Sequence, residues 1–132
     1  IKFSKLDGVI KTEVGYCGGN SNQTNYNEVC TGETNHAEVV KLEFEPTIVS
    51  YEKILEVFFK IHDSTTLNSQ GPDFGTQYRS EIFYLNDQQK IIAKKMIEKE
   101  NKKLSDKVVT KISLVKNYCA AEEYHQKYLE KR

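Results

Sequence analysis

The chain has 132 residues, which is the usual size of a single domain with one core. Nineteen basic and nineteen acidic side chains cancel to a net charge of zero, so charge favours neither nucleic acid nor an anionic membrane as a partner. No apolar run in the sequence approaches the length of a membrane span.

The three cysteines are Cys17, Cys30 and Cys119. Their odd number, their wide spacing and the lack of a Cys-x-x-Cys pair argue against a disulfide scaffold and against a structural zinc site. Free thiols are typical of a reducing compartment, so we predict a cytoplasmic protein. Each thiol taken alone is also compatible with a small buried apolar side chain.

In the first half of the chain, alternation of apolar and polar residues predicts strands over 9–16 and 38–45. The Gly- and Asn-rich segment after the first strand predicts a loop. Ser50 is a plausible N-cap for a helix over 50–61. Residues 64–77 are polar and glycine-rich, and a loop of that length in a compact domain is often functional.

The second half predicts a strand over 78–85, a helix beginning at Asn86 or Asp87, a strand over 108–115 and a last helix beginning near Ala120. Ile91, Ile92, Met96 and Ile97 are expected on the buried face of the longer helix. The order of elements favours one α+β domain over 1–132, with a mixed or mostly antiparallel sheet and helices packed on it.

The first seven residues are typical of the end of a helix, with Gly8 as its C-terminal stop. A helix leading into the first strand implies a preceding strand. Such a strand would complete a ferredoxin-like βαββαβ core, so we expect the first strand of the fold to be missing from these 132 residues.

Glu38, Tyr26 and Tyr78 carry polar groups that a core does not need. Glu38 lies on the apolar face of its strand, where burial would raise the pKa of a carboxyl group and make it a usable general acid. A carboxylate at a strand edge that leans into solvent is the alternative. The two phenols either pack and bind water or donate to an oxygen that gains charge in a reaction.

Asp73 lies between Pro72 and Phe74 in the glycine-bounded loop, where an aspartate commonly forms a turn with its own backbone. His36 and Glu38 are two residues apart on a strand, and two such groups without further ligands do not make a metal site. We therefore expect no metal. The residues alone indicate a cluster of Tyr, Glu, Asp and Cys on loops, without naming a reaction.

Five segments with distinctive sequences follow one another over nearly the whole chain: GVIKTEVGYCGG, NYNEVCTGETNHAEVVKLEFEP, SYEKILEVFFKIHD, QGPDFGTQYRSEIFY and AAEEYHQKYL. In sequence, order and spacing they resemble the A-type peptide methionine sulfoxide reductases. The resemblance implies thiol-dependent reduction of methionine-(S)-sulfoxide, free or in proteins, and a role in protein repair under oxidative stress. It implies that Tyr26, Glu38 and Tyr78 hold the sulfoxide oxygen and that Asp73 positions the site.

The resemblance also implies that no cofactor is needed, because a cysteine sulfenic acid is recycled by thioredoxin or another dithiol. The family's nucleophile lies in a Gly-Cys-Phe-Trp-Gly motif just upstream of the position matched by Ile1. These 132 residues contain no Trp, so this motif is not among them. We expect a fragment of an active enzyme. The alternative is an inactive homologue that only binds peptides containing methionine sulfoxide. Cys17 and Cys119 are the candidate resolving thiols, and an inert role for each stays open.

Overall fold

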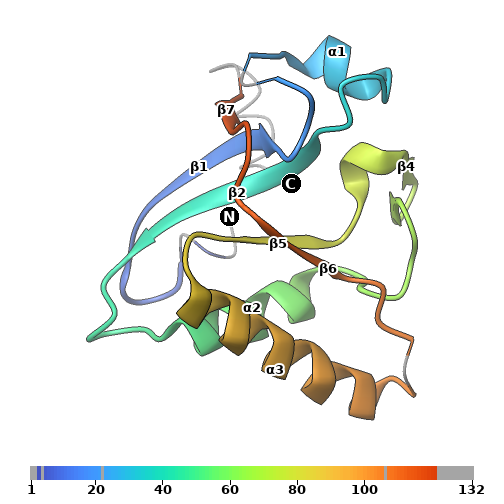
Figure 1. Ribbon diagram of the computed structural model, residues 1–132. Coiled ribbons are helices and arrows are strands. Elements are labelled where there is room, and N and C mark those ends of the chain that lie inside the picture. Colours follow the sequence, from blue (N-terminus) through green and yellow to red (C-terminus); the bar gives the residue numbers. More distant parts are fainter. Residues whose placement is uncertain (1–2, 4, 22, 106, 122–132) are drawn as a thin grey trace.

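The computed structural model of the protein describes residues 3, 5–21, 23–105 and 107–121. Figure 1 shows the β1–β2 ribbon at one side of the molecule and the helices α2 and α3 at the other, with β5 and β6 drawn between them. In chain order the elements are β1 (Val9–Cys17), α1 (Tyr26–Cys30), β2 (Ala37–Phe44), α2 (Tyr51–Ile61), β3 (Ser69–Gln70), β4 (Asp73–Phe74), the 3-10 helix η1 (Thr76–Tyr78), β5 (Glu81–Tyr84), α3 (Asp87–Lys103), β6 (Lys111–Leu114) and β7 (Cys119–Ala120).

The longest strand pairing joins β1 and β2 in an antiparallel ladder that runs from Val9 opposite Phe44 to Cys17 opposite Ala37. The short strand β7 adds to the other edge of β1, so the strand order is β2-β1-β7. Alternation therefore predicted the strands over 9–16 and 38–45 correctly, because each has one apolar face to bury.

The helix α2 packs between this sheet and the rest of the core. Its N-cap is Ser50, whose hydroxyl accepts a hydrogen bond from the backbone N–H of Lys53 at 3.1 Å. Ile54 packs near Leu42 and Phe44 of β2. Leu55 and Phe59, on the other side of the helix, face α3 and β5. The predicted helix over 50–61 is confirmed within one residue.

The main core forms where α2 and α3 cover the β5–β6 pair. β5 and β6 are parallel, with Ile82 opposite Ile112, and the chain crosses between them through α3. Ala93 and Met96 of α3 are buried against Ile82 and α2. The predicted apolar face of α3 is thus correct at Ile92, Met96 and Ile97, whereas Ile91 is 55% exposed and lies outside it.

Several predicted boundaries are corrected. The strand expected over 78–85 begins only at Glu81, because the backbone before it winds into η1. The strand expected over 108–115 is shorter, as β6. Residues 3 and 5–8 form turns instead of a helix end, although Gly8 has the positive φ of +94° expected for a stop. Ala120 belongs to β7, and the rest of the predicted last helix lies outside the described residues.

These elements confirm the predicted α+β class with mixed strand pairing. The described strands form three sheets, namely the antiparallel β2-β1-β7, the antiparallel β3-β4 and the parallel β5-β6. Among the described helices, none is both long and apolar enough to cross a membrane.

Candidate active site

One row of side chains runs across the three-stranded sheet near its β7 edge. Tyr16 of β1 lies opposite Glu38 of β2 on one side and opposite Cys119 of β7 on the other. Residues directly opposed in antiparallel strands project to the same face, so these three side chains share one face. Tyr16 is completely buried, and Glu38 is half-buried at the start of its strand.

The face that carries Glu38 is the apolar face of β2, as its alternation predicted. Leu42 and Phe44, on the same face, pack with residues of α2. Val40, which lies between Leu42 and Glu38 on this face, is 45% exposed, so the apolar cover stops before the strand reaches Glu38. The Glu38 carboxyl group therefore lies beside the buried Tyr16, at the end of the sheet that the side chains of α2 do not cover.

The helix α1 covers the same face and begins at Tyr26. The side chain of Asn25 caps it by accepting a hydrogen bond from the backbone N–H of Glu28 at 2.9 Å. Val29 is 2% exposed and packs on Tyr16. The prediction of a loop at Tyr26 is therefore corrected to a helix start, in the element that lies against the Tyr16–Glu38 row.

Tyr78 arrives beside β2 on the 3-10 helix η1, and not at the start of a strand as predicted. η1 contacts β2, and the backbone N–H of Tyr78 donates to the carbonyl of Gly75 at 3.0 Å. Gly75 has a φ of +133°, and a Cβ there would lie 2.3 Å from the Gln77 side chain, so only glycine fits this bend. Tyr78 is half-buried.

Asp73 lies on a small hairpin that contacts η1. β3 and β4 pair antiparallel, with Gln70 opposite Asp73. The hairpin is tied to the end of α2 because Gln70 exchanges two hydrogen bonds with the Asp63 backbone, at 2.9 and 2.7 Å. The segment 64–77 is mostly turns, as the loop prediction expected, with the short strands β3 and β4 and the start of η1 within it, and it brings Asp73 to the η1 side of the site.

The two candidate resolving thiols point to opposite faces of the sheet. Cys17 is one residue beyond Tyr16 in β1 and so projects to the other face, where the Tyr118 hydroxyl donates a hydrogen bond to Glu13. Cys119 lies on the face of Tyr16 and Glu38. Cys17 and Cys119 are both free, and their opposite directions argue against a bond between them in this conformation.

The environments of the two thiols also differ. The Cys17 thiol is 1% exposed and donates to the backbone carbonyl of Lys116 at 3.2 Å. Burial raises the pKa of Cys17, which disfavours the reactive thiolate. Cys119 is half-buried, and its thiol lies 3.5 Å from the backbone carbonyl of Thr24 in the segment that leads into α1.

His36 is a structural side chain on the evidence of its contacts. It is 1% exposed, and its Nε2 donates to the backbone carbonyl of Ser21 at 2.7 Å. A Cβ on Gly19 would lie 2.1 Å from the His36 ring, so the backbone packs directly on the imidazole. Among the described residues, no group of three or more His, Cys, Asp or Glu side chains is arranged to hold a metal ion.

Sequence reasoning missed a buried ion pair next to Tyr78. Arg79 and Glu81 are 2.6 Å apart, with side chains 12% and 7% exposed. Two charged residues two apart on a predicted strand were the only signal, and the pattern alone does not distinguish a buried pair from a solvated one.

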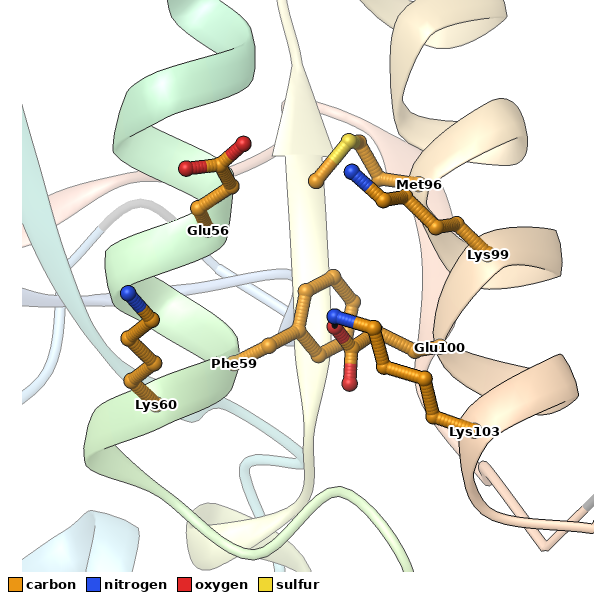
Figure 2. Close-up of a pocket in the computed structure, with 7 residues that line it drawn as sticks. All are labelled: Glu56, Phe59, Lys60, Met96, Lys99, Glu100 and Lys103. Carbon is orange, nitrogen blue, oxygen red and sulfur yellow. Dashed lines mark ion pairs between the residues drawn. The ribbon is translucent and has the colours of Figure 1, made fainter.

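A cavity of about 300 Å³ lies away from these residues, between α2 and α3. Figure 2 shows Phe59 and Met96 between the two helices, with lysine side chains from both helices around them. Glu38, Asp73 and Tyr78 do not line it, so it is separate from the candidate site.

The fold and this arrangement define an α+β domain that gathers a carboxyl group, two tyrosine-bearing segments and a thiol at one end of an antiparallel sheet. The family model described as peptide methionine sulfoxide reductase matches residues 1–132. The chain is 76% identical over 132 residues to the peptide methionine sulfoxide reductase MsrA of Pelagibacter ubique, covering 100% of this chain and 90% of that protein. The chain therefore belongs to the peptide methionine sulfoxide reductase A family, as predicted.

Solved structures agree with this assignment. The reduced form of Mxr1 from Saccharomyces cerevisiae superposes with a TM-score of 0.89 at 40% identity, covering 98% of this chain and 75% of that one. Mxr1 in complex with Trx2 superposes with a TM-score of 0.63 at 26% identity, covering 95% of this chain and 70% of that one.

Proposed function

We propose that the protein reduces methionine-(S)-sulfoxide, free or within proteins, by cysteine chemistry. The observation that carries the proposal is the convergence of three separate segments on one end of the sheet. Glu38 comes from β2, Tyr26 from the first residue of α1 and Tyr78 from η1. In a member of this family, these are the residue types that reduction of a sulfoxide requires.

The reaction transfers one oxygen atom and two electrons. A cysteine thiolate attacks the sulfoxide sulfur and forms an S–S bond to it. The oxygen, protonated by the general acid, then passes to the cysteine sulfur as the S–O and S–S bonds break. The methionine sulfur leaves as the thioether with the electron pair of the S–S bond, and the cysteine becomes a sulfenic acid. We infer that the nucleophile is the cysteine of the Gly-Cys-Phe-Trp-Gly segment that the resemblance implies. A thiol then condenses with the sulfenic acid, releasing water and forming a disulfide.

Glu38 is the proposed general acid. The sulfoxide oxygen becomes more basic as its bond to sulfur weakens, and a protonated carboxyl group within reach transfers a proton to it. Tyr26 and Tyr78 would donate hydrogen bonds to the same oxygen, which stabilises the charge that develops there. Asp73, on the hairpin that contacts η1, would orient the site through hydrogen bonds.

Recycling by a dithiol protein of the thioredoxin type completes the proposed cycle without a cofactor. The yeast relative in complex with Trx2 supports this partner. Of the two candidate resolving thiols, we favour Cys119, because it shares a sheet face with Glu38 whereas Cys17 is buried on the other face. The free thiols of the chain also favour a reducing compartment such as the cytoplasm as the place of action.

The test uses the natural full-length protein with each epimer of methionine sulfoxide and excess dithiothreitol. Formation of methionine from the S-epimer, with the R-epimer left unchanged, is the expected result. Binding of the S-epimer without any formation of methionine would overturn the reductase and support the alternative of a non-catalytic binder. Absence of both binding and turnover would overturn both functions.

A further inference from the structure

We propose that Arg79 is a positioning residue that sets the separation between Tyr78 and Glu38, an inference that rests on the proposed function. Arg79 directly follows Tyr78 and ends η1. Its guanidinium donates three hydrogen bonds, and each goes to a different structural element. They are Nε to Glu81 Oε1 at 2.6 Å, Nη1 to the Thr76 carbonyl at 2.9 Å and Nη2 to the Asn35 carbonyl at 3.1 Å.

Two of these bonds join the two halves of the candidate site. Thr76 is the first residue of η1, so the Nη1 bond from Arg79 ties the end of this short helix back to its start, with Tyr78 between them. Asn35 lies three residues before Glu38, in the segment that enters β2. One rigid, planar group therefore fixes the distance between the element that carries Tyr78 and the entry to the strand that carries Glu38.

The third bond anchors the guanidinium to the core. Glu81 belongs to β5, and its second carboxylate oxygen accepts a hydrogen bond from the Ser113 hydroxyl of β6 at 2.5 Å. The side chains of Arg79 and Glu81 are 12% and 7% exposed, so water does not compete strongly for either charge. The guanidinium also lies close to the Gly18 backbone, because a Cβ added there would come within 3.3 Å of Arg79 Nη2.

Arg79 binds the segment before β2 at a residue with an unusual backbone conformation. Asn35 has a φ of +59°, in the left-handed region that costs energy for a residue other than glycine. Its side chain is exposed, and its carbonyl is held by Arg79 from the η1 side. Loss of the Nη2 bond would leave the entry to β2 less defined, and a small displacement of a general acid costs much of its effect.

The experiment compares kinetics and stability of Arg79→Lys with those of Ser113→Ala in the natural full-length protein. Lysine keeps a positive charge for Glu81 but cannot form all three bonds. We expect Arg79→Lys to lower kcat on the S-epimer at least tenfold with a smaller change in KM. Ser113→Ala removes a hydrogen bond from the same Glu81 without touching either segment, and we expect its kcat to stay within about twofold of the unmodified protein. A normal kcat in Arg79→Lys, or equal losses in both variants, would overturn the proposal.

A double-mutant cycle with Asn35→Gly separates positioning from general destabilisation. Glycine accepts the positive φ and keeps the backbone carbonyl that Nη2 binds, but without a Cβ it lets the backbone around that carbonyl move more freely and so weakens the link. We expect Asn35→Gly to lower kcat several-fold and to add nothing to the loss in Arg79→Lys, because both changes weaken the same link. Independent, multiplying effects would overturn the proposal, and so would a normal kcat in Asn35→Gly if Arg79→Lys does not fold.

The failure of this inference is distinguishable from failure of the proposed function. The unmodified protein is assayed first on both epimers. Lack of reaction in the unmodified protein would contradict the proposed function alone. An unmodified protein that reacts, together with variants of normal kcat, would contradict the role of Arg79 alone.

Discussion

The helical end of the molecule and the end that carries the candidate active site are held together by different interactions. Apolar side chains of two long helices and the β5–β6 pair bury one another in the main core. At the other end, α1 has five residues, η1 has three, and β3 and β4 have two each. Elements this short bury little apolar surface, so caps, turns and the Arg79 hydrogen bonds define their positions.

This contrast separates stability from function in a way that substitutions can test. A change in the helical core should lower the free energy of unfolding and leave the chemistry intact. A change at the site end should alter turnover with little loss of stability, because few apolar contacts depend on it.

The largest expected effect on turnover is that of Glu38→Gln. The amide keeps the size of the side chain but cannot supply the proton, so kcat on the S-epimer should fall by about 10²–10⁴-fold. Steady-state kinetics measure the effect. Glu43→Gln, an exposed carboxylate on the same strand, is the matched control and should be near normal. A near-normal rate in Glu38→Gln would remove Glu38 from the mechanism.

The largest expected effect on stability is that of Phe59→Ala. Phe59 is 8% exposed in the core between α2 and α3, and truncation of a buried phenylalanine typically costs about 3–5 kcal/mol. Urea unfolding should show this loss, with kcat at low temperature unchanged in the folded fraction. A large fall in kcat without a loss of stability would contradict the separation of the two regions.

Acid should weaken the protein through His62 at the end of α2. Its Nδ1 donates to the Phe58 carbonyl at 2.5 Å, so in the neutral ring Nε2 accepts from the Ser80 hydroxyl at 2.7 Å. Burial lowers the pKa of His62 below its ordinary 6.5. The unfolded chain therefore binds the proton more tightly, and this stabilisation is present above pH 6.5 and lost as the pH falls from there towards the folded-state pKa.

Denaturant unfolding at a series of pH values measures this dependence. One proton contributes a slope of at most about 1.4 kcal/mol per pH unit. His62→Gln should be less stable at neutral pH and should lack that part of the slope. An unchanged slope in His62→Gln would show that other groups cause the acid sensitivity.

The smallest expected effects come from two matched helix caps, one in each region. Asn86 and Asn25 each accept a hydrogen bond at 2.9 Å from a backbone N–H of the helix that they cap. Either change to alanine should cost about 1 kcal/mol of helix stability. Thermal unfolding should detect Asn86→Ala, with kcat unchanged. Asn25→Ala should lower kcat because it loosens α1, and equal kcat values in the two variants would contradict this.

Sequence periodicity predicted the elements that bury a continuous apolar face. The alternation in β1 and β2 and the apolar face of α3 at Met96 are local signals of burial, and the Ser50 cap of α2 is a local hydrogen-bonding signal; each was correct. The site residues Glu38, Asp73 and Tyr78 were also selected from sequence, although their roles remain proposals.

Other features depend on contacts between distant segments, which a local pattern does not contain. The five-residue α1 is too short to show a helical period. η1 requires the bend at Gly75, and β7 exists only because β1 offers an edge. The opposite directions of Cys17 and Cys119 follow from the strand register, and the role of Arg79 follows from a hydrogen bond to Asn35 across 44 positions of the chain.

The central claim is that Glu38, Tyr26 and Tyr78 together hold a sulfoxide oxygen. The most direct test is an amide NMR titration of the full-length protein in which the proposed nucleophilic cysteine is changed to serine, so that the ligand is not reduced. The ligands are N-acetyl-methionine-(S)-sulfoxide and, separately, the thioether that lacks the oxygen. We predict that the sulfoxide shifts resonances at the start of β2, in α1 and in η1, with at least tenfold tighter binding than the thioether. Equal affinity for the two ligands, or shifts confined to the cavity between α2 and α3, would contradict the claim.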